Sequence, residues 1–358
     1  MNNILIIDYF SLVKRYYRLD EDQDKNDFII TFIDKILPRV IDAMVHYKPS
    51  ITIVASDMGK NVRALSINSD YKANRKKSSS LSEEELIKSK VELLKIFIKT
   101  LPVLFIENKN TEADTIIYCL VNYFKNILKL ENTKYIIGSS DSDFIQLLDD
   151  DVVIHNWNKP NFLITNKNFS NYYNGLEGFY WPDSYAFAKS FTGDISDNIK
   201  GVGGFGWKTV TKLFNIIGPI NSISDLEKKV TEQLETTNNK SNLTLLKRVQ
   251  KNILKNDSKF NLLLNNQKII DFSMLEIPYF VDINNKIKEQ LNTGVSFDQT
   301  NFKKIVSINH LMSNTNDDYI IKKNFLKEIM LLKQISLKSN NFLMSFSLDN
   351  NEESEEMD

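Results

Sequence analysis

The chain of 358 residues is 42% hydrophobic and 25% charged, a composition typical of a soluble globular protein long enough for two compact units. Its single cysteine and three histidines exclude an intramolecular disulfide and a Cys/His zinc site. Any bound metal must therefore be held by oxygen ligands, which favours magnesium or manganese. The sequence has no apolar run long enough to span a membrane, and its N-terminus lacks a basic segment and a cleavage site. We therefore expect a cytoplasmic protein without a membrane segment.

The net charge of −1 is unevenly distributed along the chain. Residues 349–358 contain six acids and no lysine or arginine, so the remainder has a net charge of +5. A mildly basic body with an acidic tail fits a nucleic-acid partner. Charge alone favours a simpler interpretation, in which this terminus is a solvated, disordered segment.

Short apolar runs that alternate with longer amphipathic stretches predict an α/β fold with a mostly parallel central sheet flanked by helices. The predicted strands are 4–8, 50–56, 102–107, 134–139 and 151–157, and the amphipathic stretches are 27–47, 82–100 and 112–130. Further along, residues 183–265 appear helical apart from a glycine cluster, and 266–336 are mostly helical. We expect domains at 1–182, 183–265 and 266–336, followed by a flexible acidic tail at 337–358.

Acidic residues follow three of the predicted strands. Asp8 ends the first strand, Asp57 follows the second, and Asp141 and Asp143 follow the fourth. Because ligands bind at the carboxyl ends of strands in an open α/β sheet, we expect these acids to meet at one rim. Two further pairs are Glu112 with Asp114, at a predicted helix start, and Asp194 with Asp197, placed by their spacing on one helical face.

Each of these acids alone fits a helix cap or a surface residue. Together, eight carboxylates in one cleft would repel one another and resist ionisation unless cations neutralised them. Two divalent ions about 4 Å apart need such a set of ligands, and they would activate a water and stabilise the leaving oxygen of a phosphodiester.

The glycines of "GVGGFG", residues 201–206, admit several interpretations. A dinucleotide-binding loop and a P-loop both need a preceding strand, and a P-loop also needs glycine directly before lysine, where Trp207 intervenes. A purely structural turn remains an alternative. The favoured interpretation is a helix–hairpin–helix, in which one helix ends near Asn198 and another begins near Trp207. Glycine lets a phosphate approach the main-chain N–H groups there, and Lys208 and Lys212 add positive charge to one face.

The segment "TGDISDNIKGVGGFGWKTVTKLF" resembles the G-D-x-S-D-N-I-x-G-V-x-G-x-G-x-K-T signature of 5′-nucleases, the family of flap endonucleases and 5′→3′ exonucleases. The segments "IIGSSDSDFIQLL", "SDYKANRKK" and "EAD" are similar to other segments of this family. Of these, "IIGSSDSDFIQLL" most resembles the form in the ribonuclease H of T-even-type phages, and "KIIDFSMLEIP" is also similar to a segment of that enzyme. The resemblance covers residues 4–280 in order and the last 80 residues only weakly.

This resemblance implies a set of carboxylates that bind two Mg²⁺ ions, with Mn²⁺ as a substitute: Asp8, Asp57, Glu112, Asp114, Asp141, Asp143, Asp194 and Asp197. It also implies a monovalent cation at the glycine hairpin. Two positions depart from the pattern. Thr115 stands where many members have another Asp, and Lys200 stands where many have Pro, which should loosen the hairpin entry and add a phosphate contact.

Four basic residues fall within 72–77, and by themselves they fit a solvated charge run. The resemblance implies a basic arch over the active site around residues 60–90, in which Lys72 and Arg75 act on the scissile phosphate and Tyr71 stacks on a base. The expected nucleic-acid contacts beyond these are Arg63, Lys76, Lys200, Gly201, Gly203, Gly206, Lys208 and Lys212.

We therefore predict a magnesium-dependent 5′-nuclease that acts as a monomer on RNA·DNA hybrids, duplex DNA or flaps, in primer removal during viral DNA replication inside the host cell. The alternatives are a PIN-like RNA endonuclease, which would lack the glycine hairpin, and a non-catalytic DNA-junction-binding protein, which should have lost carboxylates.

The apolar residues at 342–344, 346 and 348 directly precede the acidic terminus. Such a tail fits docking onto a sliding clamp or single-strand-binding protein, and it fits equally a segment that packs back on the body.

Overall fold

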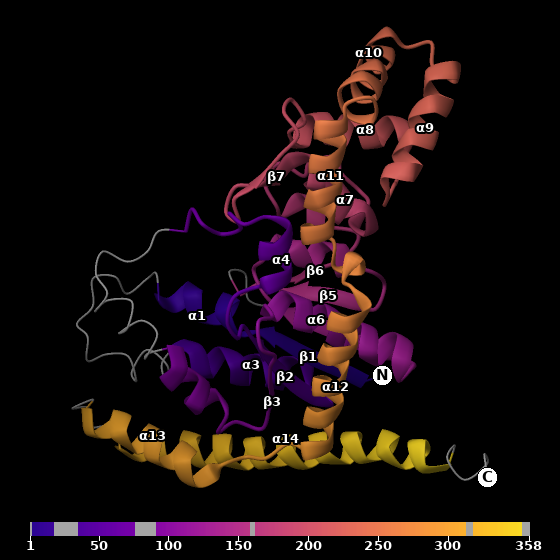
Figure 1. Ribbon diagram of the computed structural model, residues 1–358. Helices are drawn as coiled ribbons and strands as arrows, with labels where there is room; N and C mark the ends of the chain where they lie inside the picture. Colours follow the sequence, from indigo (N-terminus) through magenta and orange to yellow (C-terminus); the bar gives the residue numbers. More distant parts are fainter. Residues whose placement is uncertain (1, 18–34, 76–90, 158–161, 313–317, 353–358) are drawn as a thin grey trace. The chain divides into compact units, whose positions relative to one another are not determined.

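The computed structural model describes residues 2–17, 35–75, 91–157, 162–312 and 318–352 (Figure 1). The chain divides into two compact units. The first comprises Met1–Met58, Lys77–Ser140 and Val281–Asp358, and the second comprises Gly59–Lys76 and Asp141–Phe280. This division differs from the domain boundaries expected from sequence, because both units are built from separate stretches of the chain. Over the residues described, no helix is both long and apolar enough to cross a membrane.

The first unit is built on four parallel strands, which confirms the predicted α/β fold class. They are β1 (Asn2–Asp8), β2 (Ile51–Ser56), β3 (Leu104–Glu107) and β4 (Thr133–Gly138), hydrogen-bonded in the order β3-β2-β1-β4. Ile6 at the centre pairs with Ile53 on one side and Ile137 on the other, and all three side chains are fully buried. Their apolar side chains stabilise the sheet by removing hydrocarbon surface from water.

Three helical segments of the first unit lie within the predicted amphipathic stretches: α3 (Leu37–Tyr47), a helical stretch at 91–98, and α6 (Ala113–Asn122) with its extension Tyr123–Ile127. A further helix, α1 (Tyr9–Tyr17), was not among the predicted stretches. The helix α3 begins with a proline in its first turn and ends at Lys48, whose φ of 45° is left-handed. Its apolar side chains recur at helical spacing and are buried, so burial of one face stabilises this helix.

The C-terminal region is helical beyond the point expected. It contains α12 (Ile277–Thr293), α13 (Gln299–Met312) and α14 (Asp318–Glu352) (Figure 1). Asn340 of α14 accepts the Val295 N–H and donates to the Val295 carbonyl, at 2.8 Å each, and Leu343 is buried at 5% exposure. Residues from 337, expected to be a flexible tail, thus continue in α14, and buried Leu343 and hydrogen-bonded Asn340 hold this part of the helix to the unit.

The second unit consists mainly of helices. These are α4 (Val62–Ile67), α7 (Tyr185–Thr192), α8 (Trp207–Ile217), α9 (Ile223–Thr236), α10 (Lys240–Val249) and α11 (Asp257–Ile270), with short helical turns at Ser142–Leu147, Phe169–Asn171, Pro182–Ser184, Gln250–Leu254 and Phe272–Met274. Two antiparallel strand pairs accompany them: β5 (Val152–His155) with β6 (Leu163–Ile164), and β7 (Gly193–Asp194) with β8 (Ile199–Lys200).

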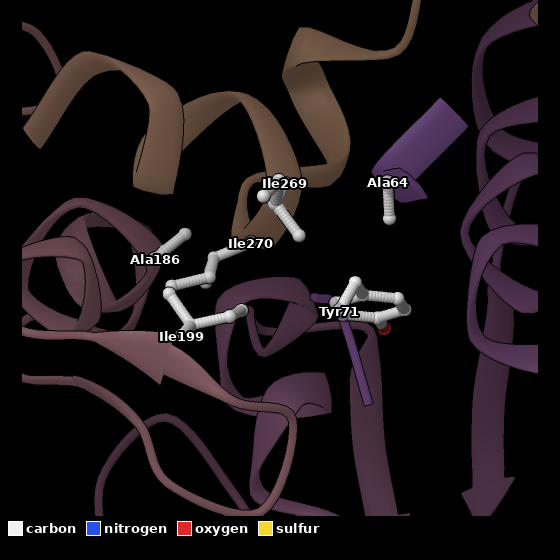
Figure 2. Close-up of a cluster of buried hydrophobic side chains, with 6 residues drawn as sticks. All are labelled: Ala64, Tyr71, Ala186, Ile199, Ile269 and Ile270. Atoms are coloured by element: carbon white, nitrogen blue, oxygen red, sulfur yellow. The ribbon is translucent and has the colours of Figure 1, made fainter. Parts of the chain in front are cut away.

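A small apolar cluster joins the segment 59–76 to the helices of the second unit (Figure 2). Its members come from four separate parts of the chain: Ala64, Tyr71, Ala186, Ile199, Ile269 and Ile270. Tyr71 lies among these aliphatic groups at 9% exposure. The expectation that its ring stacks on a nucleic-acid base is therefore not supported, because the ring already packs against the protein's own core.

Candidate active site

The carboxylates expected as metal ligands form two groups, one in each unit. The first acidic group is Asp8, Asp57, Glu112 and Asp114, and the second acidic group is Asp141, Asp143, Asp194 and Asp197. Each group is described within its own unit.

Asp8 lies at the carboxyl end of β1 and is 9% exposed. Its Oδ2 accepts a hydrogen bond from the Ser139 hydroxyl at 2.9 Å, and its Oδ1 accepts the Ser11 N–H at 3.1 Å. Ser139 directly follows the neighbouring strand β4, so the bond joins the ends of two adjacent strands. These bonds hold the carboxylate in one orientation and stabilise its charged form.

Asp57 and Glu112 lie where β2 and α6 meet. The Asp57 Oδ1 accepts the Ala113 N–H at 2.7 Å, and Glu112 is the residue that precedes α6, with 8% exposure. A bridge between Met58 and Thr111 draws the two loops together. Asp8 and Asp57 thus lie at the carboxyl ends of adjacent strands, and Glu112 precedes the helix whose first N–H is bound by Asp57.

Asp114 is oriented by the residue that departs from the family pattern. The Thr115 hydroxyl donates to the Asp114 Oδ1 at 3.1 Å, and Thr115 is buried. A threonine at this position therefore supports the carboxylate beside it instead of adding another.

In the second acidic group, Asp141 caps a short helical turn and its Oδ1 accepts the Asp143 N–H at 3.0 Å. The Lys189 ammonium of α7 forms a close ion pair with the Asp143 Oδ1 and a second with the Asp194 Oδ2 at 2.7 Å. The Lys189 side chain is only 8% exposed. A buried lysine thus lies between two of the expected metal ligands.

Burial raises the pKa of Asp143 to about 7, against the opposing effect of Lys189. Burial also disfavours the charged form of Asp194, but Lys189 and the hydrogen bonds from Ser196 outweigh it and lower the pKa of Asp194 to about 2. Burial alone would lower the pKa of Lys189, whereas Asp143 and the other neighbouring groups raise it well above its usual value. The lysine is therefore a permanent positive charge.

Asp194 and Asp197 do not share a helical face, contrary to the expectation. The helix α7 ends at Thr192, and a tight turn connects β7 to β8, in which the Asp197 N–H donates to the Asp194 carbonyl at 3.3 Å. Gly193 follows the last residue of α7 with a φ of +70°, which is incompatible with continuing the helix, and a Cβ there would lie 2.4 Å from the Ile199 carbonyl oxygen. Only glycine fits this position.

Asp197 contacts the basic residues expected in the arch. Arg75 pairs with its Oδ1 at 2.7 Å, the Lys72 ammonium lies 3.7 Å from its Oδ2, and the Tyr71 hydroxyl donates to Oδ2 at 3.2 Å. Lys72 has a left-handed backbone, with a φ of 59°, and residues 71–75 form turns. The two cations therefore converge on Asp197 through turns of the chain.

Arg63 and Lys76 were also expected to contact nucleic acid. Arg63 is buried, and its guanidinium donates to the carbonyls of Lys268 at 2.5 Å and Ile269 at 3.4 Å, at the end of α11. Its contacts are those of a residue that caps a helix, so the expected phosphate contact is not supported. Lys76 lies outside the described residues.

The glycine cluster forms a loop that leads into α8, as expected. Gly201 packs against α7, since a Cβ there would lie 2.2 Å from the Thr192 carbonyl oxygen. Gly204 has a φ of +85° in a turn closed by the Phe205 N–H and the Val202 carbonyl at 3.0 Å. Gly203 and Gly206 border open space, so a phosphate could approach the backbone at these positions.

The basic residues of this loop and of α8 are exposed: Lys200, Lys208 and Lys212. Lys212 donates to the Ser241 hydroxyl at 2.5 Å. Arg248 of α10 donates to the Gly204 carbonyl at 3.3 Å and lies over the Phe205 ring at 4.8 Å. These two contacts connect the glycine loop to α10.

The donor set fits a hard divalent cation, because all eight expected ligands are carboxylates. Among the residues that the structure describes, no three acids or histidines are close enough to form a metal-binding group. In the second acidic group, Lys189 pairs with Asp143 and Asp194, and Arg75 and Lys72 pair with Asp197. The carboxylates of the second acidic group are thus stabilised by nearby positive charge, which a bound metal ion could also supply.

Sequence reasoning missed Lys189, Ser139 and Arg248. The signal for Lys189 was a single charged residue within the apolar run "YAFAKSF", residues 185–191. A buried lysine requires a carboxylate partner, and the next acid along the chain is Asp194. Ser139 and Arg248 gave no comparable signal.

Comparison with known proteins finds relatives of this chain among nucleases. Residues 3–174 match the model of the 5′-3′ exonuclease N-terminal, resolvase-like domain. A 5′-3′ exonuclease of Mycoplasmopsis pulmonis is 29% identical over 302 residues, which covers 80% of this chain and 89% of that protein. The flap endonuclease Xni of Psychromonas ingrahamii is 26% identical over 258 residues, covering 71% of this chain and 89% of that protein.

The fold is similar to that of the T5 D15 protein co-crystallised with metal ions, with a TM-score of 0.57 and 21% identity, covering 86% of this chain and 99% of that one. A complex of the T5 D15 flap endonuclease with DNA and metal ions gives a TM-score of 0.56. The chain is therefore similar in sequence to 5′-3′ exonucleases and flap endonucleases, and its residues 3–174 match the N-terminal domain of that family.

Proposed function

We propose that this protein is a magnesium-dependent 5′-nuclease that hydrolyses phosphodiester bonds near the 5′ end of RNA·DNA hybrids, duplex DNA or flaps, and that it removes primers in viral DNA replication. The observation that carries the proposal is the pair of acidic groups, one at the carboxyl edge of a parallel sheet and one around the β7–β8 turn. Similarity to these nucleases supports hydrolysis as the reaction.

The first acidic group and the second acidic group would hold the ions, two Mg²⁺ by this proposal. When bound, they would supply an activated water and stabilise charge on the leaving oxygen. The bonds from Ser139 to Asp8 and from Thr115 to Asp114 orient carboxylates before any substrate arrives. This preorganisation lowers the cost of assembling the site.

Lys72 and Arg75 would exchange the Asp197 carboxylate for the scissile phosphate. Both are cations already held beside an expected metal ligand. An arginine fork matches the geometry of a phosphate, and its interaction strengthens as charge develops during cleavage.

The loop 201–206 and α8 would bind the duplex backbone. The open space at Gly203 and Gly206 and the exposed Lys200, Lys208 and Lys212 support this role. We also propose that this loop binds a monovalent cation. Main-chain N–H groups and lysines position a phosphate but carry no information about the base.

Lys208→Glu should therefore weaken binding by the same factor on duplexes of different sequence. The slope of the logarithm of the binding constant against the logarithm of the salt concentration should become shallower by about the value of one phosphate contact. Fluorescence anisotropy at several salt concentrations would measure both. Lys228→Glu, an equal charge change at an exposed position of α9, is the matched control and should change neither. A base preference that disappears in Lys208→Glu would contradict the assignment.

A set of 5′-labelled substrates tests the activity itself: an RNA·DNA hybrid, a blunt duplex, a 5′ flap and a single-stranded RNA, each with and without Mg²⁺. We expect Mg²⁺-dependent short products from the 5′ end of the first three. Internal cleavage of the single-stranded RNA alone would favour a PIN-like endonuclease. Tight binding of the branched DNA without cleavage in Mg²⁺ or Mn²⁺ would favour a non-catalytic junction-binding protein.

The C-terminus gives two separable expectations, one for the helix and one for the acidic end. Deleting 340–358 removes Asn340 and buried Leu343 and should lower the melting temperature by about 5 °C or more. Deleting only 353–358 should leave the melting temperature unchanged.

If the acidic end recruits a sliding clamp or single-strand-binding protein, as we propose, the short deletion should abolish stimulation by that partner while cleavage of free substrates is retained. Equal stimulation of the full-length protein and the protein without residues 353–358 by that partner would refute recruitment.

A further inference from the structure

Lys189 is the feature of the second unit that the proposed reaction does not use. Its ammonium pairs with Asp143 and Asp194, which come from different parts of the chain. The side chain is 8% exposed and extends from α7, a helix whose neighbouring residues are apolar and buried. The Lys189 ammonium is therefore held between the two carboxylates and is not a solvent-exposed surface partner of either one.

A cation between two carboxylates occupies the position that a bridging divalent ion would take. Two buried acids without a counter-charge repel each other and resist ionisation. Lys189 prevents this in the metal-free protein, and it would oppose an incoming ion by direct charge repulsion. At an effective dielectric constant of about 20, charges a few ångströms apart interact strongly enough to change a binding constant by more than tenfold.

We propose that Lys189 is an internal counter-cation that takes the place of a divalent ion between Asp143 and Asp194, leaves these carboxylates when the ion binds, and so sets the affinity of the second acidic group for metal. This inference rests on the proposed function, since it assumes that these carboxylates bind metal. It assigns to Lys189 a positioning role and no contact with the scissile bond.

The same arrangement predicts that the chain folds without metal. Lys189 offsets part of the negative charge of Asp143 and Asp194, so the second unit should not depend on an ion for its stability. Asp197 is neutralised in a parallel way by Arg75 and Lys72. These two cations are the ones proposed to move to phosphate, so Asp143 and Asp194 share one cation that can leave, and Asp197 has two.

The test is a titration of the full chain with Mn²⁺, in which free ion is measured by electron paramagnetic resonance. Lys189→Gln should bind at least one Mn²⁺ about tenfold more tightly than the wild type. Its melting temperature without metal should fall, and saturating Mn²⁺ should raise it by more than in the wild type, because the ion then supplies the missing charge. Unchanged or weaker Mn²⁺ binding by Lys189→Gln would overturn the inference.

Lys95→Gln is a matched control in the first unit. The Lys95 side chain is also 8% exposed, and it also joins two carboxylates, Glu107 at 2.6 Å and Glu92 at 3.1 Å. Lys99 still contacts Glu107 at 3.4 Å when Lys95 is lost. This variant should lose stability without any gain in Mn²⁺ affinity, and an equal gain would mean that the effect is not specific to the second acidic group.

A measurement on the unmodified protein keeps the inference testable if Lys189→Gln does not fold. Acetylation of lysines by acetic anhydride, mapped by mass spectrometry, should show Lys189 protected without metal and more reactive with saturating Mn²⁺. Equal protection in both conditions would overturn the proposed displacement. Failure of the wild type to bind Mn²⁺ at all, with Lys189→Gln binding it, would support the inference, whereas failure of both chains to bind would overturn the inference and the proposed metal dependence together.

Discussion

Replacing Asp141 and Asp143 together by asparagine should slow cleavage by about 10³-fold or more while substrate binding changes only a few-fold. Asp143 lies against Lys189, and Asp141 caps the turn that carries it. Asparagine keeps the shape of both side chains but removes the charge that a divalent ion requires. The loss should therefore appear in the chemical step and not in docking.

Single-turnover rates and an independent binding assay on the same flap substrate would separate the two effects. Asp150→Asn with Asp151→Asn is the matched control, since these exposed acids follow in the same region and the charge change is identical. The control should cleave at the wild-type rate. Wild-type cleavage by the Asp141 and Asp143 double variant would remove these residues from the active site.

Replacing Arg75 by alanine should slow the chemical step by about 10²-fold with little loss of duplex binding, and Lys72→Ala should have a smaller effect of the same kind. Arg75 is the better placed of the two, because its guanidinium lies 2.7 Å from the Asp197 carboxylate and the Lys72 ammonium 3.7 Å. As charge develops on the phosphate, the arginine fork gains more than a single ammonium does.

Single-turnover kinetics at saturating enzyme would test this prediction, with Lys60→Ala as the control. Lys60 is an exposed cation of the same segment, so its loss should leave the single-turnover rate unchanged. If Arg75→Ala raised the dissociation constant and left the single-turnover rate unchanged, residues 71–75 would be a docking surface and not part of the reaction.

Much of the first unit follows from local sequence. The strands β1, β2 and β4 are nearly continuous apolar runs, and such runs form parallel strands because both faces of the sheet are covered. The position of Asp8 and Asp57 at strand ends then follows from the topology of a parallel sheet. The start of α8 at Trp207 was also predictable, since the glycine cluster interrupts the helical pattern directly before it.

The motif residues near Asp194 were identified from sequence, but their geometry was not. Their spacing fits a helical face, and yet Gly193 ends α7 and a tight turn between β7 and β8 holds the two acids. The turn depends on the close approach of Gly193 to Ile199 and of Gly201 to Thr192. These are contacts across the hairpin that no local pattern encodes.

The sequence by itself determined the fold class and the resemblance to 5′-nucleases, and it singled out eight carboxylates as candidate ligands, because apolar periodicity and motif spacing are properties of neighbouring residues. Only the tertiary structure decided which cations accompany them. Tyr71 became part of the core, Arg63 a helix cap, and Lys189 a counter-cation. A basic or aromatic side chain has the same chemistry in each of these roles, and its partner, which lies tens of residues or more away in most cases, decides between them.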